Sequence, residues 1–242
     1  MSFFEYNGRS SKEFGLHIEK KDVFSAPAFD IDFESIPGRN GDLITSNKRF
    51  KNIRITYTVF FVQKDINSLS KTIRDIKGWL YTEPDRYHEI SDSYDTGYLR
   101  YGVIYEGIDI EEQLNKLGCF RITFNCKPFK YNKTGFNEKA LKSGDTIINP
   151  ELFSCSPIIS VVGNGNITMT LQNASYNKTW HFKDIEKSIV CDSERMNFYS
   201  GTTLLNENVV GEGFPQLPPG ETTISYTGNV TELKVQPRWC SL

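Results

Sequence analysis

The stretch that decides the fold is Ile53–Phe61, which reads IRITYTVFF. Its apolar residues stand at every second position, and Arg54, Thr56 and Thr58 stand between them. Successive side chains of a β-strand point to opposite faces, so this alternation predicts a strand with one buried and one exposed face. The β-branched and aromatic residues that fill the stretch also favour strands. We therefore expect a chain built mainly from half-buried β-strands.

The same period of two recurs on both sides of this stretch. FDIDFE at 29–34 alternates aromatic or aliphatic residues with three acidic ones, and FRITFNC at 120–126 repeats the pattern. The three carboxylates on one strand face indicate a solvated or interface-facing surface rather than a cation site. Cys126 continues the apolar alternation and is interpreted as a small buried hydrophobic residue.

One segment breaks the period of two. In DINSLSKTIRDIKGWLY, at 65–81, the apolar residues are spaced by three and four, as on one stripe of an amphipathic helix: Ile66, Leu69, Ile73, Ile76 and Leu80. Asp65 and Asn67 are candidate N-caps, and Pro84 ends any continuation. We predict one helix lying on a sheet, with Trp79 as a large anchor near its end.

A change in composition and periodicity along the chain predicts the domain boundary. Residues 132–149 are polar and weakly periodic, which indicates a first domain over 1–133, a linker over 134–149 and a second domain over 150–242. The second part carries strand-like stretches at roughly ten-residue spacing, which is typical of a β-sandwich. These stretches are 157–163, 166–173, 178–185, 187–193, 222–227 and 231–237.

Turn residues predict how the strands of the second domain are joined. GNGN at 163–166 and Gly228–Asn229 are interpreted as hairpin turns. In GEGFPQLPPGETTISY, at 211–226, Pro219 and Gly220 suit the central pair of a type II turn. This proline-rich stretch is expected to be a rigid loop that leads into the last hairpin.

Composition and spacing argue against catalysis and against nucleic-acid binding. The net charge of −2 gives no basic surface to hold phosphates. His17, His88 and His181 lie far apart, and the five cysteines include no C-x-x-C pair. We expect no catalytic residue, no metal and no cofactor. The thiols are expected to be reduced, and no apolar run approaches the ~18 residues of a membrane helix.

One group of residues supports an alternative function. Sugar-binding sandwiches stack a pyranose on an exposed aromatic ring and bind its hydroxyls with polar side chains. A candidate sugar site comprises Asn177, Trp180, His181, Glu194 and Arg195. The competing interpretation is a tryptophan half-buried in a strand.

Several motifs together resemble the distal tail protein (Dit) family of long-tailed phages. FEYNGRSSKEFGLHIEK at 4–20, SIPGRNGDLI at 35–44 and CFRITFNCKPFKY at 119–131 are similar to the N-terminal part of the family. The stretches at 180–194 and 211–239 resemble its galectin-like domain. The resemblance implies a mainly β fold: an N-terminal β-sandwich or split-barrel domain with one α-helix, followed by a galectin-like β-sandwich domain.

The resemblance also implies a structural function without catalysis. Members of the family form a hexameric ring that joins the tail tube to tail-tip, tail-associated lysin or fibre proteins. DNA only passes through such a ring, and no membrane is involved. The place implied is the virion tail tip, after assembly in the cytoplasm of the bacterial host. A functional virion, a cryptic prophage and a phage-like particle all stay open.

The most recognisable motif of the first domain supplies a candidate oligomer contact. It comprises Ile36, Pro37, Gly38, Arg39 and Gly41. Proline stiffens such a loop, and glycine lets two backbones approach closely. Two other classes stay open: a carbohydrate-binding module for host cell-wall glycan, and a wall hydrolase with converging carboxylates.

Overall fold

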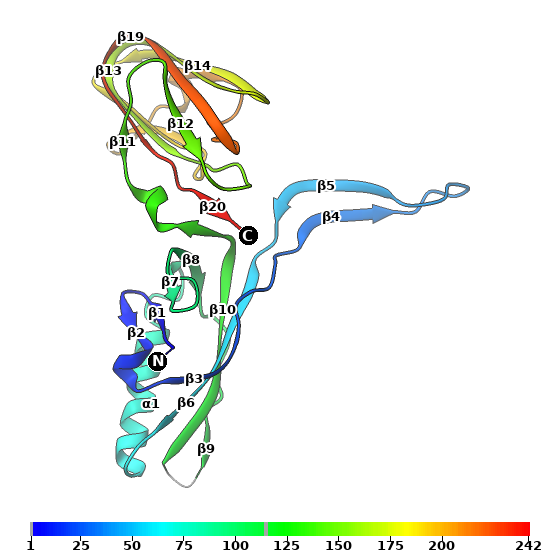
Figure 1. Cartoon of the computed structure of the whole chain (residues 1–242), viewed down its shortest axis with the longest axis vertical. Helices are drawn as coiled ribbons and strands as arrows, with labels where there is room; N and C mark the ends of the chain where they lie inside the picture. The colour runs from blue at the N-terminus through cyan, green and yellow to red at the C-terminus, as the bar shows by residue number, and fades with distance from the viewer. Residues whose placement is uncertain (1, 114–115) are drawn as a thin grey trace. The chain divides into compact units, whose positions relative to one another are not determined.

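The computed structural model describes residues 2–113 and 116–242 and is mainly β, as the sequence predicts. The chain forms two compact units. The first runs up to Lys130, and the second comprises Tyr131–Ser241. Figure 1 shows the strands of both units and the helix α1 (Ile66–Leu80).

The first unit is built on an open antiparallel sheet in the order β2-β1-β7-β8-β10-β6-β3, with β9 also paired to β10. Its strands are β1 (Phe4–Tyr6), β2 (Arg9–Ser10), β3 (His17–Asp22), β6 (Ile53–Val62), β7 (His88–Asp92), β8 (Tyr98–Val103), β9 (Glu111–Gln113) and β10 (Leu117–Asn132). A short 3-10 helix, η1 (Ser11–Phe14), joins β2 to β3. In the described residues the end strands β2 and β3 do not pair with each other, so this sheet is open and not a closed barrel.

The central pair β6 and β10 confirms the predicted alternation. Ile53 pairs with Cys126, and the register continues without a break to Val62 opposite Leu117. The buried face of β6 carries Ile53, Ile55, Tyr57, Val59 and Phe61. Because both strands alternate in step, their apolar faces coincide and form the middle of the core.

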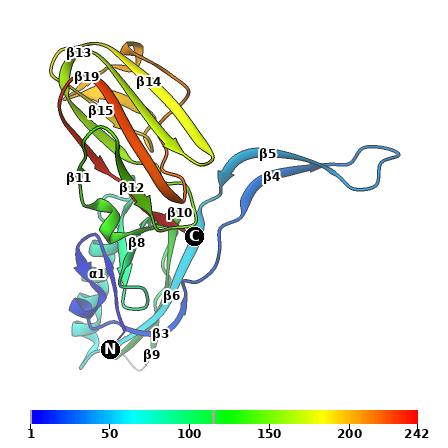
Figure 2. The ribbon, with the colours of Figure 1, turned by 45° about the horizontal axis from the view of Figure 1, so that its top comes forward.

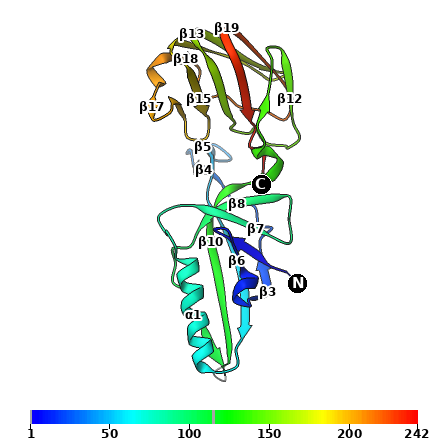
Figure 3. The same cartoon turned by 90° about the vertical axis from the view of Figure 1, so that its left-hand side faces the viewer.

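The helix α1 lies along this sheet, as Figure 3 shows. Asp65 is its N-cap, and the carboxylate accepts hydrogen bonds from the backbone N–H groups of Asn67 and Ser68, both at 3.0 Å. The indole of Trp79 is buried, stacks on Phe14 and donates to the backbone oxygen of Tyr6 at 2.9 Å. The predicted helix and anchor are therefore confirmed. Of the two candidate N-caps, Asp65 is the cap, whereas Asn67 lies inside the helix.

The strands β4 (Phe29–Glu34) and β5 (Leu43–Phe50) form a separate two-stranded sheet in the first unit. The alternation of β4 predicts a half-buried strand, and this prediction is wrong. Phe29 and Phe33 are exposed, whereas Asp30 on the opposite face is buried. The reason is that, within the described residues, β4 and β5 pair only with each other and no second layer covers them.

The second unit is a sandwich whose two layers share their longest strands. The strands of the sandwich are β11 (Lys139–Ala140), β12 (Asp145–Asn149), β13 (Ile158–Asn173), β14 (Tyr176–Ile185), β15 (Ser188–Asp192), β16 (Asn197–Ser200), β17 (Thr203–Leu204), β18 (Val209–Gly211) and β19 (Gly220–Gln236). The short strand β20 (Cys240–Ser241) pairs instead with β10, whose last residues belong to the same unit. Two 3-10 helices, η2 (Lys133–Phe136) and η3 (Asn206–Asn208), lie among them.

The strands β13 and β19 bend together and pass from one layer to the other (Figure 2). The first half of β13 pairs with β15, and its second half pairs with β14. The register shifts where Gly163–Asn166 meets Gly228–Asn229. The two predicted hairpin turns are therefore wrong: Gly165 and Gly228 have positive φ angles of 76° and 105°, and they allow bulges that bend continuous strands.

The stretch 134–149, expected to be a linker, contains β11 and β12, and both strands pair with β19. Polar residues dominate because these are short strands at the edge of the sandwich, where one face meets water. The compact units instead divide between Lys130 and Tyr131.

The proline-rich loop is held by hydrogen bonds, as a rigid loop requires. Leu217 is buried, and its backbone N–H and C=O both bond to Cys155, at 2.9 and 3.0 Å. Gly220 has the positive φ of 85° that the predicted type II turn needs. The loop leads into the bent strand β19 rather than into a terminal hairpin.

Candidate functional site

The most unusual surface of the chain is the β4–β5 hairpin. Every residue from Asp32 to Arg49 is exposed. Phe33 lies opposite Ile44 in the register, and their side chains are 61% and 59% exposed. Ile36 and Leu43 extend this apolar surface, with exposed fractions of 39% and 40%. An exposed apolar patch on a strand pair is typical of a protein-binding surface.

The tip of the hairpin contains the predicted contact motif. The backbone N–H of Arg39 donates to the C=O of Ile36 at 3.1 Å and closes a tight turn. Gly38 and Gly41 have φ angles of 79° and 82°, which glycine adopts without strain. All five motif residues are exposed, and the guanidinium of Arg39 has no ion-pair partner within residues 2–113 and 116–242. The tip therefore presents a cation and an apolar side chain on a stiff turn.

The base of the hairpin is anchored. The buried carboxylate of Asp30 accepts from Arg49 Nε at 2.8 Å and lies 3.2 Å from Lys51 Nζ. The hydrogen bond from the Arg49 guanidinium, more than the Lys51 charge, lowers the pKa of Asp30 below its usual value. Phe50 packs edge-on against Phe29 and Phe129, so the base joins the end of β10. Beyond this anchor the described hairpin has no cover.

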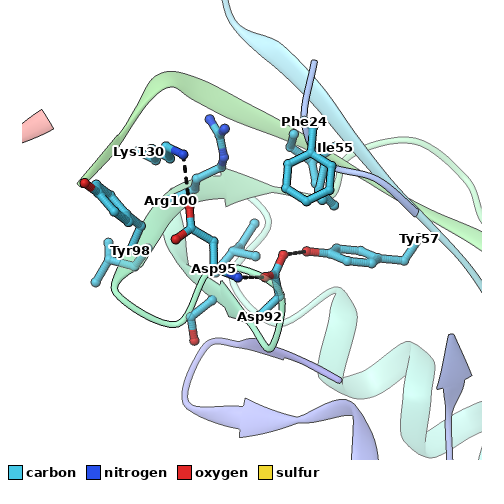
Figure 4. A pocket seen from close by; sticks show the side chains of 12 residues that line it. Phe24, Ile55, Tyr57, Asp92, Asp95, Tyr98, Arg100 and Lys130 are labelled. Atoms are coloured by element: carbon cyan, nitrogen blue, oxygen red, sulfur yellow. Dashed lines mark hydrogen bonds and ion pairs between the residues drawn. The ribbon is translucent and has the colours of Figure 1, made fainter. Parts of the chain in front are cut away.

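A small cavity in the first unit holds a polar cluster, which Figure 4 shows. Its volume is about 40 Å³, far below the roughly 300 Å³ of typical ligand pockets. Tyr57 Oη donates to Asp92 at 2.7 Å, and Lys130 Nζ lies 2.9 Å from Asp95. Burial raises the pKa of Tyr57 and lowers the pKa of Arg100. These paired charges fix strands to one another, and the cavity is too small for a sugar or a nucleotide.

The structure does not assemble the candidate sugar site. Trp180 is fully buried, and its Nε1 donates to the C=O of Gly213 at 2.9 Å, so no ring face is available for stacking. Asn177 and His181 lie on the opposite, exposed face of β14 and line a shallow hollow with Val210. Side chains at successive positions of a strand point to opposite faces. The ring at position 180 therefore points into the core, whereas the side chains at 177, 179 and 181 point to the other face.

The last two residues of that candidate set lie in the other layer of the sandwich. Glu194 and Arg195 follow β15, where Arg195 lies 3.6 Å from the buried Asp192 and Glu194 lies 3.7 Å from Arg238. Arg238 also binds Asp192 directly at 2.7 Å. This cluster of ion pairs joins β15 to the segment before β20, and it does not meet Asn177 or His181.

The three histidines occupy separate environments. His17 stacks on Phe60, His88 bonds to the backbone oxygen of Glu83 at 3.0 Å, and His181 bonds to Thr168 at 3.1 Å. Among the described residues, no group of three or more His, Cys, Asp or Glu side chains is placed to hold a metal. In the same part of the chain, no helix has the length and apolar character needed to cross a bilayer.

The sequence did not predict β5, the second strand of the hairpin. It also did not predict that β4 and β5 are both exposed. The stretch LITSNKRF of β5 alternates only weakly and carries several polar residues. The available signal was that a Pro-Gly turn at 37–38 connects an alternating strand to this polar stretch. Alternation alone does not show whether another layer covers the apolar face.

Comparison with known proteins finds a family model that matches most of the first unit. Residues 10–126 match the family model of the phage tail protein RIFT-related domain. The first unit is therefore similar to this domain of phage tail proteins. Its predicted resemblance to tail proteins of long-tailed phages is confirmed.

The whole chain has the fold of a Dit protein. It matches the SPP1 Dit protein, which is described as a paradigm of the hub adsorption apparatus in phages that infect Gram-positive bacteria, with a TM-score of 0.75. The match covers 100% of both chains at 15% identity. A chain of the phage p2 baseplate, in its activated conformation with Sr, matches with a TM-score of 0.49 over 97% of both chains at 9% identity. Curated proteins include no sequence that matches.

Proposed function

We propose that this chain is a phage tail protein and acts as a hub at the distal end of the tail, where copies of it close into a hexameric ring. The observation that carries the proposal is the uncovered hairpin within a phage tail domain. A two-stranded hairpin is marginally stable alone in water, so a partner that covers Phe33 and Ile44 stabilises it. The fold shared with the SPP1 hub protein supports the same role.

A neighbouring copy is the occupant that best fits the hairpin. When each subunit extends a strand pair onto the next, the contact is heterologous, and a closing rotation turns it into a ring. The apolar patch of every copy is then covered by its neighbour, and no copy has an open strand edge there. Ile36, Pro37, Gly38, Arg39 and Gly41 at the tip are the proposed contact, with Arg39 reaching a carboxylate or carbonyl of the neighbour.

The second unit is proposed to be a galectin-like docking domain. In this arrangement the ring joins the tail tube protein on one side to a tail-tip, tail-associated lysin or fibre protein on the other. The near-zero net charge suits a channel through which DNA passes, since a basic lining would bind the phosphates. The proposed place is the virion tail tip, after assembly in the host cytoplasm. No step of this function needs catalysis.

The mass of the purified protein in solution tests the proposal. We expect light scattering and native mass measurement to give closed hexamers for the wild type. Phe33→Thr with Ile44→Thr keeps strand-favouring residues but removes the apolar pair, and it should shift the population to monomers with an unchanged circular dichroism spectrum. Leu204→Thr, which changes a residue of the second unit that is 64% exposed, is the matched control and should leave the hexamer intact.

A second variant separates the tip from the shaft of the hairpin. Ile36→Ser with Arg39→Glu should weaken the ring if the tip makes the contact, whereas a ring unaffected by this change would restrict the contact to Phe33 and Ile44. A wild type that stays monomeric at micromolar concentration, even with the tail tube protein added, would overturn the hub proposal.

A further inference from the structure

Two cysteines far apart in the sequence meet inside the second unit. Cys155 lies in the loop between β12 and β13, and Cys240 lies in β20, 85 positions later. Their sulfur atoms are 3.5 Å apart, and the residues are 0% and 4% exposed. All five cysteines have free thiols in this structure, and these two are in direct contact.

Two donors point at the sulfur of Cys155. They are the backbone N–H of Cys240 at 3.2 Å and the S–H of Cys240 at 3.5 Å. The side-chain amide of Asn149 lies 3.5 Å from the same sulfur, and its two N–H groups also point at the C=O groups of Phe153 and Leu217, both at 2.9 Å. Donors aimed at one sulfur favour its anionic form, which is the nucleophilic form of cysteine.

The two thiols differ in acidity for a physical reason. The hydrogen bond from the Cys240 S–H lowers the pKa of Cys155 below its usual value, although burial opposes this effect. The same bond raises the pKa of Cys240, because ionising it would break the contact. By contrast, burial raises the pKa of Cys126 and of Cys191 to about 12.

We propose that Cys155 and Cys240 are a redox pair that closes a disulfide when a peroxide reaches it, with Cys155 as the attacking sulfur. The Cys155 thiolate attacks one peroxide oxygen, the O–O bond breaks, and hydroxide leaves with the proton that Cys155 released. The sulfur of Cys240 then attacks the sulfenic acid on Cys155, and the S–O bond breaks. Its proton and the hydroxyl leave as water. Two thiols lose two electrons, and hydrogen peroxide becomes two waters.

The disulfide ties together three segments of the second unit. Cys155 is already paired through its backbone with Leu217 of the proline-rich loop. A covalent bond to Cys240 adds β20 to this pair and closes a long loop of chain, which restricts the unfolded state. The strand β20 has two residues, so brief opening of this strand is the expected route for the oxidant. This inference does not depend on the proposed ring.

Peptide mapping of the whole protein tests the pair. The protein is treated with hydrogen peroxide, denatured and alkylated, and we expect a linked peptide pair that contains Cys155 and Cys240. Three alkylated thiols should remain of the five, and a reductant should restore all five. The apparent Tm of the second unit should rise on oxidation and fall back on reduction. Cys191→Ala removes a different buried thiol as the matched control, and it should give the same linked pair.

Two further variants identify the attacking sulfur. With Cys240→Ser, a dimedone probe should label a sulfenic acid at Cys155, whereas with Cys155→Ser the probe should not label Cys240. Labelling at Cys240 alone would overturn the assignment of the attacking sulfur. Recovery of five free thiols from peroxide-treated wild type, or a linked pair that involves another cysteine, would overturn the redox pair itself. Because the peptide map uses the wild type, it decides the proposal even if a variant fails to fold.

Discussion

At the scale of single residues, Trp180 joins the core of the second unit to its proline-rich loop. Its indole is buried against Gly211, and its N–H bonds to the C=O of Gly213. A side chain at position 211 would collide with the ring, so the packing of Trp180 requires a glycine at this position. The residue that sequence analysis considered for sugar stacking therefore acts in packing.

Trp180→Phe should destabilise the second unit by about 2 kcal/mol, because it leaves a cavity and removes one hydrogen bond. Urea unfolding followed by circular dichroism measures this difference. His181→Ala, on the exposed face of the same strand, is the control and should change the stability little. An unchanged urea midpoint for Trp180→Phe would show that the indole is not essential to the core.

Asp65 is a residue whose charge contributes to stability in a predictable pH range. The hydrogen bond from the backbone N–H of Ser68, the largest of several effects, lowers the pKa of its carboxyl in the folded protein. A carboxyl with a lowered folded pKa stabilises the fold above its unfolded pKa of about 4, and the contribution disappears as pH falls through the folded pKa.

Asp65→Asn keeps an oxygen acceptor at the N-cap but does not titrate. We expect the Tm of this variant to be below that of the wild type at neutral pH, with the difference shrinking as the solution is acidified below pH about 4. Asp75→Asn, on the exposed face of the same helix, is the control. A difference between wild type and Asp65→Asn that stays constant across this range would contradict the role of the charge.

At the scale of elements, two strand pairs show opposite uses of β-structure. The bent pair β13 and β19 is buried on alternate residues in both layers. The hairpin β4–β5 has hardly any buried residue, although its strand β4 alternates as clearly as β6 does. What distinguishes them is whether another layer lies opposite the apolar face.

The hairpin should be the first site of proteolysis in the monomeric Phe33→Thr and Ile44→Thr variant. Exposed backbone at a loop tip opens easily, so trypsin should cut after Arg39, Lys48 or Arg49. Lys139 and Lys142 should resist longer, because β11 and β12 bond to β19 on both sides of the turn that joins them. In the assembled wild type a neighbouring copy should protect the hairpin.

Mass spectrometry of the first fragments distinguishes these outcomes. Arg39→Gln with Lys48→Gln removes two of these three cleavage points from the monomeric variant and should slow the first cut. A first cut within 134–149 would instead support a mobile linker between the domains.

At the scale of the whole molecule, each unit has its own core, so we expect two thermal transitions. Gly102→Ala places a methyl group 2.5 Å from Ile90 Cδ1 and 2.7 Å from Cys126 Sγ, both in the first core. This overpacking should cost about 1–3 kcal/mol and lower only the transition of the first unit. Trp180→Phe should lower only the transition of the second.

Differential scanning calorimetry separates these effects. Gly107→Ala is the control, because its added methyl group meets nothing within 4 Å. If Gly102→Ala and Trp180→Phe each lower the same single transition, the chain unfolds as one cooperative body and the proposal of two domains fails.

The sequence determined those features that depend on near neighbours along the chain. The alternation of Ile53–Phe61 predicted a half-buried strand, the spacing from Ile66 to Leu80 predicted the helix, and Asp65 was one of two candidates for its cap. The mainly β class followed from these periods. Residues a few positions apart set the local backbone conformation, and for that reason such features can be read without a structure.

Only the tertiary structure decided which faces are covered and which distant residues meet. It showed that Phe33 is exposed, that Trp180 points inward, and that Gly165 and Gly228 bend continuous strands instead of ending hairpins. It also brought Cys155 to Cys240 across 85 positions. Burial and contact depend on what lies opposite a residue in space, and that is set by the packing of strands far apart in the chain, not by their own periodicity.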